Sequence, residues 1–177
     1  MKTLILLFHP NITESRVNKR LIDELKKQDV PNVTVRDEYS VYPDGKIDVG
    51  YEQKLVEEND RIIFQFPLYW YSSPSLLKKW EDRVLLYGWA YGTDGDVLAN
   101  KQLSLAISAG SPDESYHPYG AFGQTMDAII APFMATSRFV GAEFAKPFIT
   151  TGVTNGLDDT QLAKRAAQYV QYIKAEQ

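Results

Sequence analysis

The sequence predicts a three-layer α/β sandwich, in which a doubly wound, five-stranded parallel sheet of order 2-1-3-4-5 carries helices on both faces. Strand-length apolar runs alternate with helical segments along the 177 residues, a pattern typical of right-handed β–α–β crossovers. The run Thr3–Phe8 is apolar without alternation, as expected of a strand covered on both faces. The length suits one domain over residues 1–177.

The elements follow in a regular order. Ser15 is the expected N-cap of the first helix, because apolar residues recur at helical spacing behind it. The turn-rich stretch around Pro43 separates the second strand from a weakly amphipathic helix, and Pro132 is expected to kink or split the fourth helix. The expected strands are 3–8, 32–37, 61–66, 101–108 and one within 144–153; the expected helices are 15–28, 49–59, 75–87, 125–140 and 158–175.

The composition excludes several classes of protein. A net charge of −4 and a pI near 5.2 argue against a nucleic-acid partner, which requires clustered Lys and Arg. The chain has no cysteine and two histidines, so disulfides, thiolate chemistry and a Cys- or His-rich metal site are not expected. No run approaches the roughly 20 apolar residues of a membrane span. We therefore expect a soluble, cytoplasmic protein without a metal.

The ligand site of such a sheet lies outside the carboxyl ends of its strands, beside the first strand. The loop His9–Asn18 leads into a helix N-terminus, where free N–H groups favour a phosphate. Ser15 and Asn18 can add hydrogen-bond donors, and Arg16 or His9 can add positive charge if either turns inward. The alternative is that Ser15 only caps the helix and His9 is a partly exposed loop residue.

A second loop, Pro67-Leu68-Tyr69-Trp70-Tyr71, places three aromatic residues where polar turn residues are usual. Aromatic rings and backbone amides of this kind form a wall for a flat ligand. An aromatic core cluster under the end of the sheet is the other interpretation. The segment Gly88–Gly92 adds two aromatic residues between glycines, which fits a lid, a packed surface turn or a dimer contact.

Motifs of other α/β enzymes are absent. The chain contains no G-x-G-x-x-G dinucleotide fingerprint, no G-x-x-x-x-G-K-[ST] phosphate loop and no G-x-S-x-G nucleophile elbow. A phospho-receiver would require acidic residues at the ends of the first and third strands, where Phe8-His9 and Phe66-Pro67 stand instead. Classical dinucleotide binding, NTP binding, hydrolase chemistry and phospho-relay are therefore disfavoured.

Several motifs in order resemble the NAD(P)H:quinone oxidoreductase branch of the flavodoxin-like superfamily over nearly the whole chain. Two further motifs are most similar to its bacterial subgroup of general-stress oxidoreductases and potassium-efflux ancillary quinone reductases. The motifs are His9-Pro10, Ser15-Arg16-Val17-Asn18, Pro67–Tyr71 and Leu76–Trp80, and for the subgroup Tyr42-Pro43-Asp44 and Gly88–Gly92.

The resemblance implies a flavin, FMN rather than FAD, and a set of residues around it. The phosphate would lie on Ser15, Arg16, Val17 and Asn18 with His9 near the phosphate arm, and the ring along Pro67, Leu68, Tyr69, Trp70 and Tyr71. The family's Thr-Thr-Gly-Gly loop falls on Ser108, Ala109, Gly110 and Ser111, so only the first glycine is retained.

Two residues of the following loop are catalytic candidates. Tyr116 matches a tyrosine that the family carries near the flavin, six residues after Gly110. The best-known members carry a histidine six residues further on, where this chain has Phe122. His117 is the histidine that remains nearby, and the alternative for it is a surface-loop residue without a catalytic role.

The implied activity is hydride transfer from NAD(P)H through FMN to quinones or similar two-electron acceptors. The resemblance also implies a homodimer whose second subunit closes the acceptor site, with Trp80, Trp89 and Tyr91 as contributing residues. Two alternatives remain open, namely a flavin-bearing regulatory subunit of a potassium efflux transporter and a one-electron carrier of the flavodoxin type.

Overall fold

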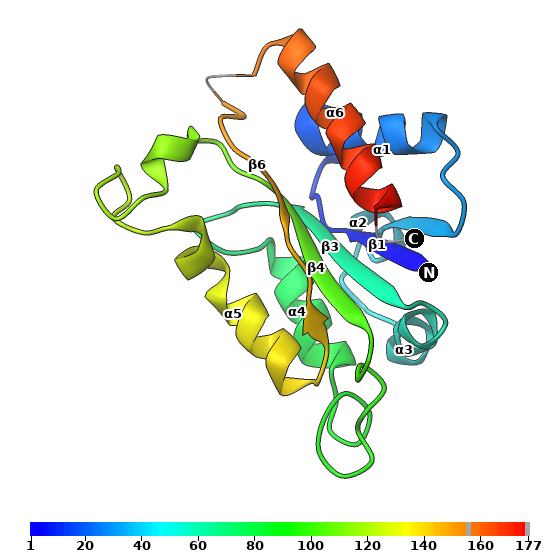
Figure 1. The fold of residues 1–177 in the computed structure, drawn as a ribbon. Coiled ribbons are helices and arrows are strands. Elements are labelled where there is room, and N and C mark those ends of the chain that lie inside the picture. The colour runs from blue at the N-terminus through cyan, green and yellow to red at the C-terminus, as the bar shows by residue number, and fades with distance from the viewer. Residues whose placement is uncertain (155–156, 176–177) are drawn as a thin grey trace.

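The computed structural model describes residues 1–154 and 157–175. Its centre is a parallel sheet with the order β2-β1-β3-β4-β5, and β6 also pairs with β4 (Figure 1). The predicted doubly wound α/β fold is thereby confirmed. The strands are β1 (Thr3–Leu7), β2 (Val33–Asp37), β3 (Arg61–Pro67), β4 (Gln102–Ser108), β5 (Glu143–Phe144) and β6 (Phe148–Thr150).

Helices cover both faces of the sheet (Figure 1). On one face, β1 and β3 pack against α3, α4 and α5, and on the other they pack against α1 and α6. Alternate residues of the buried strands supply the two cores, as a parallel sheet with two covered faces requires. The helices are α1 (Val17–Lys27), α2 (Glu38–Val41), α3 (Val49–Glu57), α4 (Ser75–Val84), α5 (Met126–Phe139) and α6 (Asp159–Lys174), with 3₁₀ turns η1 (Ile12–Glu14) and η2 (Asp113–Ser115).

The last predicted strand is present in two pieces. β5 and β6 both pair with β4. The Ala145 N–H still donates to the Leu103 carbonyl at 2.9 Å, and the ladder is interrupted between there and Phe148. Pro147 has no N–H to donate to a ladder, while the Ser104 hydroxyl contacts the carbonyl oxygens of Ala145 and Lys146 at 3.4 and 3.2 Å. The interruption therefore has a local cause.

The helices differ in detail from those expected. α1 begins at Val17, two residues after Ser15, although the Ser15 Oγ still accepts a hydrogen bond from the Asn18 N–H at 3.1 Å. α4 ends at Val84 rather than at residue 87, and α2 was not expected. Pro132 lies inside α5 without dividing it into two helices.

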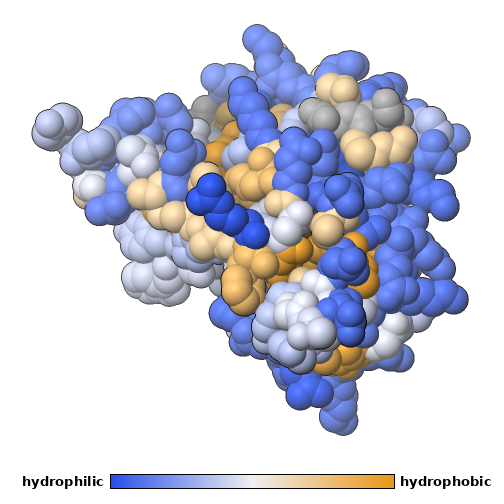
Figure 2. Space-filling view, turned by 60° about the horizontal axis from the view of Figure 1, so that its bottom comes forward, coloured by the Kyte–Doolittle hydropathy of each residue, from blue (hydrophilic) through white to orange (hydrophobic). Residues whose placement is uncertain are grey.

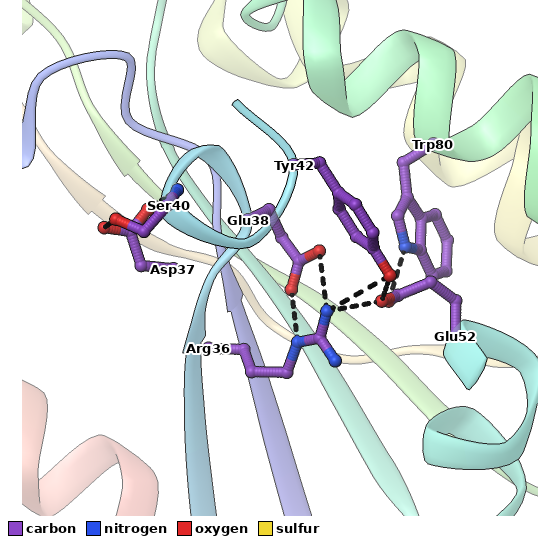
Figure 3. Close-up of polar contacts among 7 residues, drawn as sticks. All are labelled: Arg36, Asp37, Glu38, Ser40, Tyr42, Glu52 and Trp80. Atoms are coloured by element: carbon purple, nitrogen blue, oxygen red, sulfur yellow. Dashed lines mark hydrogen bonds and ion pairs between the residues drawn. The ribbon is translucent and has the colours of Figure 1, made fainter. Parts of the chain in front are cut away.

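A buried charged cluster ties β2 and α2 to α3 and α4 (Figure 3). Glu52 accepts hydrogen bonds from Arg36 at 2.6 Å, from the Tyr42 hydroxyl at 2.6 Å and from the Trp80 indole at 2.9 Å. Glu38 accepts from the Arg36 Nε at 2.9 Å. We call these five residues the Glu52 cluster.

Trp80 was expected to contribute to a dimer contact, and this expectation is wrong. Its side chain is only 1% exposed, because its ring packs edge-on against Phe8 and Phe64 while its N–H is held by Glu52. Trp80 is therefore a core residue.

Across the described ranges, no helix is both long enough and apolar enough to span a bilayer.

Candidate functional site

The loop between β1 and α1 has a polar lining that carries little net charge. The His9 Nδ1 accepts a hydrogen bond from the Asn11 N–H at 3.2 Å. Burial lowers the pKa of His9, so the ring is neutral near pH 7 and its proton lies on Nε2. His9 therefore offers a hydrogen-bond donor rather than the positive charge considered from the sequence.

Arg16 does not supply that charge either. Its guanidinium contacts the Leu157 carbonyl and forms an ion pair with Asp159, at 2.9 Å, in the first turn of α6. Arg16 thus holds α6 against the start of α1 instead of turning toward the strand ends. The remaining donors at this helix start are backbone N–H groups and the Ser15 hydroxyl, whose oxygen is already engaged by Asn18.

A chain of four buried, uncharged side chains lies beneath this helix start. Tyr169 donates to the Gln65 Oε1 at 2.8 Å, and the Gln65 Nε2 donates to the Asn18 Oδ1 at 3.2 Å and to the Asn18 carbonyl at 3.3 Å. The Asn18 Nδ2 then donates to the Ser108 Oγ at 2.8 Å. We call this arrangement the Gln65 chain.

The Gln65 chain joins two loops that the sequence placed at the site and adds two residues that it did not identify. Asn18 and Ser108 were expected there, whereas Gln65 and Tyr169 were missed. Each of the missed residues sits inside an apolar pattern, one in β3 and one on the buried face of α6. A glutamine within the apolar stretch 62–66 of β3 was the signal that was available for Gln65.

The loop after β3 exposes its aromatic side chains. Tyr69, Trp70 and Tyr71 are 44%, 93% and 49% exposed, so the alternative of a buried aromatic cluster is wrong for this loop. Trp70 and Tyr71 adopt positive φ values of 50° and 60°, which costs non-glycine residues about 1 kcal/mol each. Backbone strain of this kind concentrates at ligand sites.

The start of this loop is fixed to the neighbouring strand. Pro67 is in register with Ser108, and the Leu68 N–H donates to the Ser108 carbonyl at 2.8 Å. Tyr69 and Ser72 exchange two backbone hydrogen bonds of 3.0 and 2.9 Å, which close the turn around Trp70. The exposed rings thus stand on a backbone that is held in place.

The loop after β4 packs closely against the segment that follows β6. At Gly110, a Cβ atom would lie 2.8 Å from the Thr154 Oγ1, so a side chain there would collide with that neighbouring loop. The backbone N–H of Ala109 donates to the Thr150 carbonyl at 2.8 Å. Ser108, Ala109, Gly110 and Ser111 therefore form a closely packed edge at the end of β4.

Tyr116 is brought toward the aromatic loop through Phe122. The Phe122 ring lies 5.1 Å from the ring of Tyr116 and 5.2 Å from that of Tyr71. Tyr116 is 6% exposed, and burial raises its pKa, an effect partly offset by hydrogen bonds with Ser111. Its hydroxyl therefore stays protonated at neutral pH.

His117 lies differently from Tyr116. Its side chain is 58% exposed, and its Nε2 is 3.8 Å from the Asp113 carboxylate, one turn earlier. The structure thus places Tyr116, Phe122 and Tyr71 in one aromatic group and leaves the His117 ring largely in solvent.

These loops bring exposed aromatic side chains and the polar starts and ends of α1 and β4 together at the carboxyl edge of the sheet. A protein-family model described as "Flavodoxin-like fold" matches residues 1–173. The chain belongs to this family.

Curated relatives match along most of their length. General stress protein 14 of Bacillus subtilis (strain 168) is 50% identical over 97% of this chain and 98% of its own. The NAD(P)H oxidoreductase YrkL of the same organism is 44% identical over 99% of both chains. The potassium-efflux ancillary protein KefG of Cronobacter sakazakii is 41% identical over 84% of this chain and 79% of its own.

Solved structures agree on the fold. General stress protein 14 of Treponema denticola, solved in complex with FMN, is 39% identical over 100% of both chains, with a TM-score of 0.92. An NADPH-quinone reductase from P. pentosaceus is 29% identical over 97% of both chains, with a TM-score of 0.84. A structure described as a thermophilic tryptophan halogenase from Streptomycin violaceusniger is 49% identical over 96% of this chain and 97% of its own, with a TM-score of 0.92.

Proposed function

We propose that the protein is an FMN-dependent NAD(P)H oxidoreductase that reduces quinones or similar two-electron acceptors. One observation carries the proposal: an exposed aromatic loop after β3 and the polar ends of α1 and β4 meet at one edge of the sheet. The relatives support it, since one is named an NAD(P)H oxidoreductase, another holds FMN and a third is a quinone reductase. Halogenase activity is not carried over, because these other names agree on reductase or flavin chemistry.

The start of α1 suits the phosphate arm of FMN. Its N-terminal N–H groups and dipole favour an anion. The Ser15 oxygen accepts a hydrogen bond from the Asn18 N–H, and the Ser15 hydroxyl can still donate its own proton. The His9 Nε2–H adds a neutral donor. Ser15 and the backbone N–H groups of Arg16 and Val17 would thus hold the phosphate, while the Arg16 side chain remains paired with Asp159. Asn18 would act indirectly, because its N–H already donates to the Ser15 oxygen and its side-chain amide to Ser108.

The loop after β3 suits the ring. Pro67, Leu68 and the exposed rings of Tyr69, Trp70 and Tyr71 would form one side of its site, and the edge at residues 108–111 would form the other. When bound, FMN supplies the ability to accept a hydride from NAD(P)H and to pass it to the acceptor. The protein orients the reactants and places donors where negative charge develops.

Tyr116 is the residue to which we assign a catalytic donor role. Its hydroxyl is protonated and its ring packs on Phe122 beside the aromatic loop, so it can donate a hydrogen bond where negative charge develops on the reduced ring. We assign no such role to His117, because its ring is largely in solvent. Tyr116→Phe should lower kcat with quinone about tenfold or more and leave FMN bound. The matched control is Tyr119→Phe, since Tyr119 is fully exposed in the same loop.

The direct test of the activity is anaerobic visible spectroscopy of the FMN-loaded protein. Addition of NAD(P)H should bleach the flavin band, and subsequent addition of a quinone should restore it. A flavin that stays oxidised with both NADH and NADPH would contradict the proposal. A blue semiquinone that accumulates during reductive titration would favour the one-electron carrier instead.

We propose a homodimer that forms through the side of α5 and the segment after α4. Exposed apolar side chains gather there: Tyr87 is 66%, Met134 43% and Phe139 69% exposed, and Figure 2 shows apolar residues grouped among hydrophilic ones. Tyr91 packs on Phe139 with ring centroids 5.0 Å apart. We call these four residues the α5 patch. Patches of this kind mark interaction surfaces.

The α5 patch is continuous with the candidate site. A groove of about 590 Å³ is lined by Tyr91 and Phe139 and also by Ser72 and Ser73 of the loop after β3. A second copy seated there would therefore border the ring site. Phe139→Asp should convert a dimer into a monomer by sedimentation, whereas Val41→Asp, at an apolar residue exposed elsewhere, should not. A monomeric parent protein would contradict the proposal.

A role as a flavin-bearing subunit of a potassium efflux transporter is the second candidate function. The identity of 41% to a KefG ancillary protein favours it, and both roles can reside in one protein. A cytoplasmic location, proposed from the absence of cysteine, is compatible with either. Negligible quinone turnover together with co-purification of a transporter would favour the regulatory role.

A further inference from the structure

The hydrogen-bond directions in the Gln65 chain are set by one backbone carbonyl. The main-chain oxygen of Asn18 can only accept, so the group of Gln65 that faces it must be the Nε2 amine. The Gln65 Oε1 then faces Tyr169, whose hydroxyl donates to it. Because burial raises the pKa of Tyr169, that hydroxyl keeps its proton throughout the physiological range.

The direction is passed on from Gln65 to Ser108. The second proton of the Gln65 amine goes to the Asn18 Oδ1, which leaves the Asn18 Nδ2 to face Ser108. The Ser108 oxygen therefore accepts, and its own proton is left over. Among the side-chain hydrogen bonds of residues 1–154 and 157–175, the Ser108 Oγ takes part in the one from the Asn18 Nδ2, where it is the acceptor.

Burial fixes the orientation of the amide groups in the Gln65 chain. Gln65 and Tyr169 are fully buried, Asn18 is 2% exposed and Ser108 is 6% exposed. An amide in this setting cannot turn over without placing two acceptors or two donors against each other, a mismatch that water does not relieve in the interior. The four groups thus hold one orientation.

We propose that Gln65 is a positioning residue: it orients the Asn18 amide so that the Ser108 hydroxyl is left to donate its proton to bound FMN. The inference rests on the proposed function and deepens it, since it specifies which buried residue orients the Ser108 hydroxyl toward that ligand. If Gln65 is lost, the Asn18 amide is free to turn, and Ser108 then donates to the Asn18 oxygen instead of to the ligand.

The test is a double-mutant cycle on the affinity for FMN, measured by quenching of flavin fluorescence in the full-length protein. Ser108→Ala should weaken FMN binding about tenfold, the effect of one buried hydrogen bond. Ser108→Thr retains the hydroxyl and should stay within about threefold of the parent. Gln65→Met retains the volume but not the amide, and should cost about as much as Ser108→Ala even though Ser108 is present.

The double variant separates positioning from general damage. If Gln65 acts through Ser108, Gln65→Met should weaken binding at most about threefold further in the Ser108→Ala background. Independent effects that multiply would overturn the proposal. Tyr172→Phe is the matched control for the fold. It removes a tyrosine hydroxyl of α6 that hydrogen-bonds Ser104 and the Lys146 carbonyl, neither of which belongs to the Gln65 chain. This variant should leave FMN affinity unchanged.

A second measurement is independent of both flavin and mutation. In apo-protein, the side-chain amide protons of Asn18 and Gln65 should give resolved NMR signals that exchange slowly with solvent, because both are bonded and buried. Fast exchange of these protons would overturn the proposed orientation. If the parent protein binds no FMN while the amide protons are protected, the proposed function fails and the hydrogen-bond chain stands.

Discussion

The Glu52 cluster and the Gln65 chain are both buried polar networks, but they differ in charge and in how they end. The Glu52 cluster contains two carboxylates and one guanidinium, and its donors are turned inward on Glu52 and Glu38. The Gln65 chain is uncharged and ends in a hydroxyl with a spare proton at the edge of the sheet. The Glu52 cluster therefore serves to hold elements together, whereas the Gln65 chain leaves a hydroxyl donor for the proposed ligand.

The closed network should show itself mainly in stability. Glu52→Ala would leave Arg36, Tyr42 and Trp80 without their common acceptor in a buried setting. We expect the free energy of unfolding to fall by about 3–5 kcal/mol, the cost of breaking a buried ion pair from one side. Urea unfolding of apo-protein measures it. Glu58→Ala, which removes only an exposed partner of Lys54, should change stability by less than about 0.5 kcal/mol.

The charge of the closed network should appear as a pH dependence. Burial, together with the neighbouring Glu52, raises the pKa of Glu38 to about 7. A carboxyl whose pKa is higher in the folded than in the unfolded state stabilises the fold when protonated, so its contribution is complete below about pH 4.5 and is lost as the pH rises through 7.

The variant Glu38→Gln removes that titration. Between pH 5 and pH 8, the free energy of unfolding of the parent should fall by about 1–3 kcal/mol more than that of the variant. Glu81, whose pKa burial also raises to about 7, titrates in both proteins, so only the difference between the two curves is used. Parallel curves would show that Glu38 is already ionised at pH 5.

The smallest expected effect concerns the strained loop after β3. Trp70 is 93% exposed and has φ of 50°, so its ring gains little from the fold while its backbone carries strain. Trp70→Gly should leave the free energy of unfolding unchanged or raise it by up to about 1 kcal/mol. The same variant should weaken FMN binding or slow turnover. A loss of stability above 1 kcal/mol would mean that the ring serves the fold.

The sheet order was predictable from the sequence because apolar runs and helical spacing report burial directly. The run Thr3–Phe8 is an example, since its lack of alternation reflects helices on both faces. The short helix α2 was not predictable, because its four residues are too few to establish a period. The break near Pro147 depends on how Ser104 meets two carbonyl groups across the sheet, and periodicity carries no such information.

The candidate site was predictable only where its residues break a pattern. Tyr69, Trp70 and Tyr71 stand out because aromatic residues replace turn residues. Gln65 breaks the apolar pattern of its strand, but its partner Tyr169 lies on a helix 104 residues further along the chain, and no pattern in the sequence connects the two. Trp80 shows the opposite error, since a large aromatic residue expected at a dimer contact proved to be held in the core by Glu52.

Equilibrium titration of the full-length apo-protein with FMN, and in parallel with riboflavin, tests the central claim most directly. We expect one FMN bound per chain with a dissociation constant in the micromolar range or below, and markedly weaker binding of riboflavin, because riboflavin lacks the phosphate that the donors at the start of α1 are proposed to hold. Absence of FMN binding, or equal affinity for the two ligands, would contradict it.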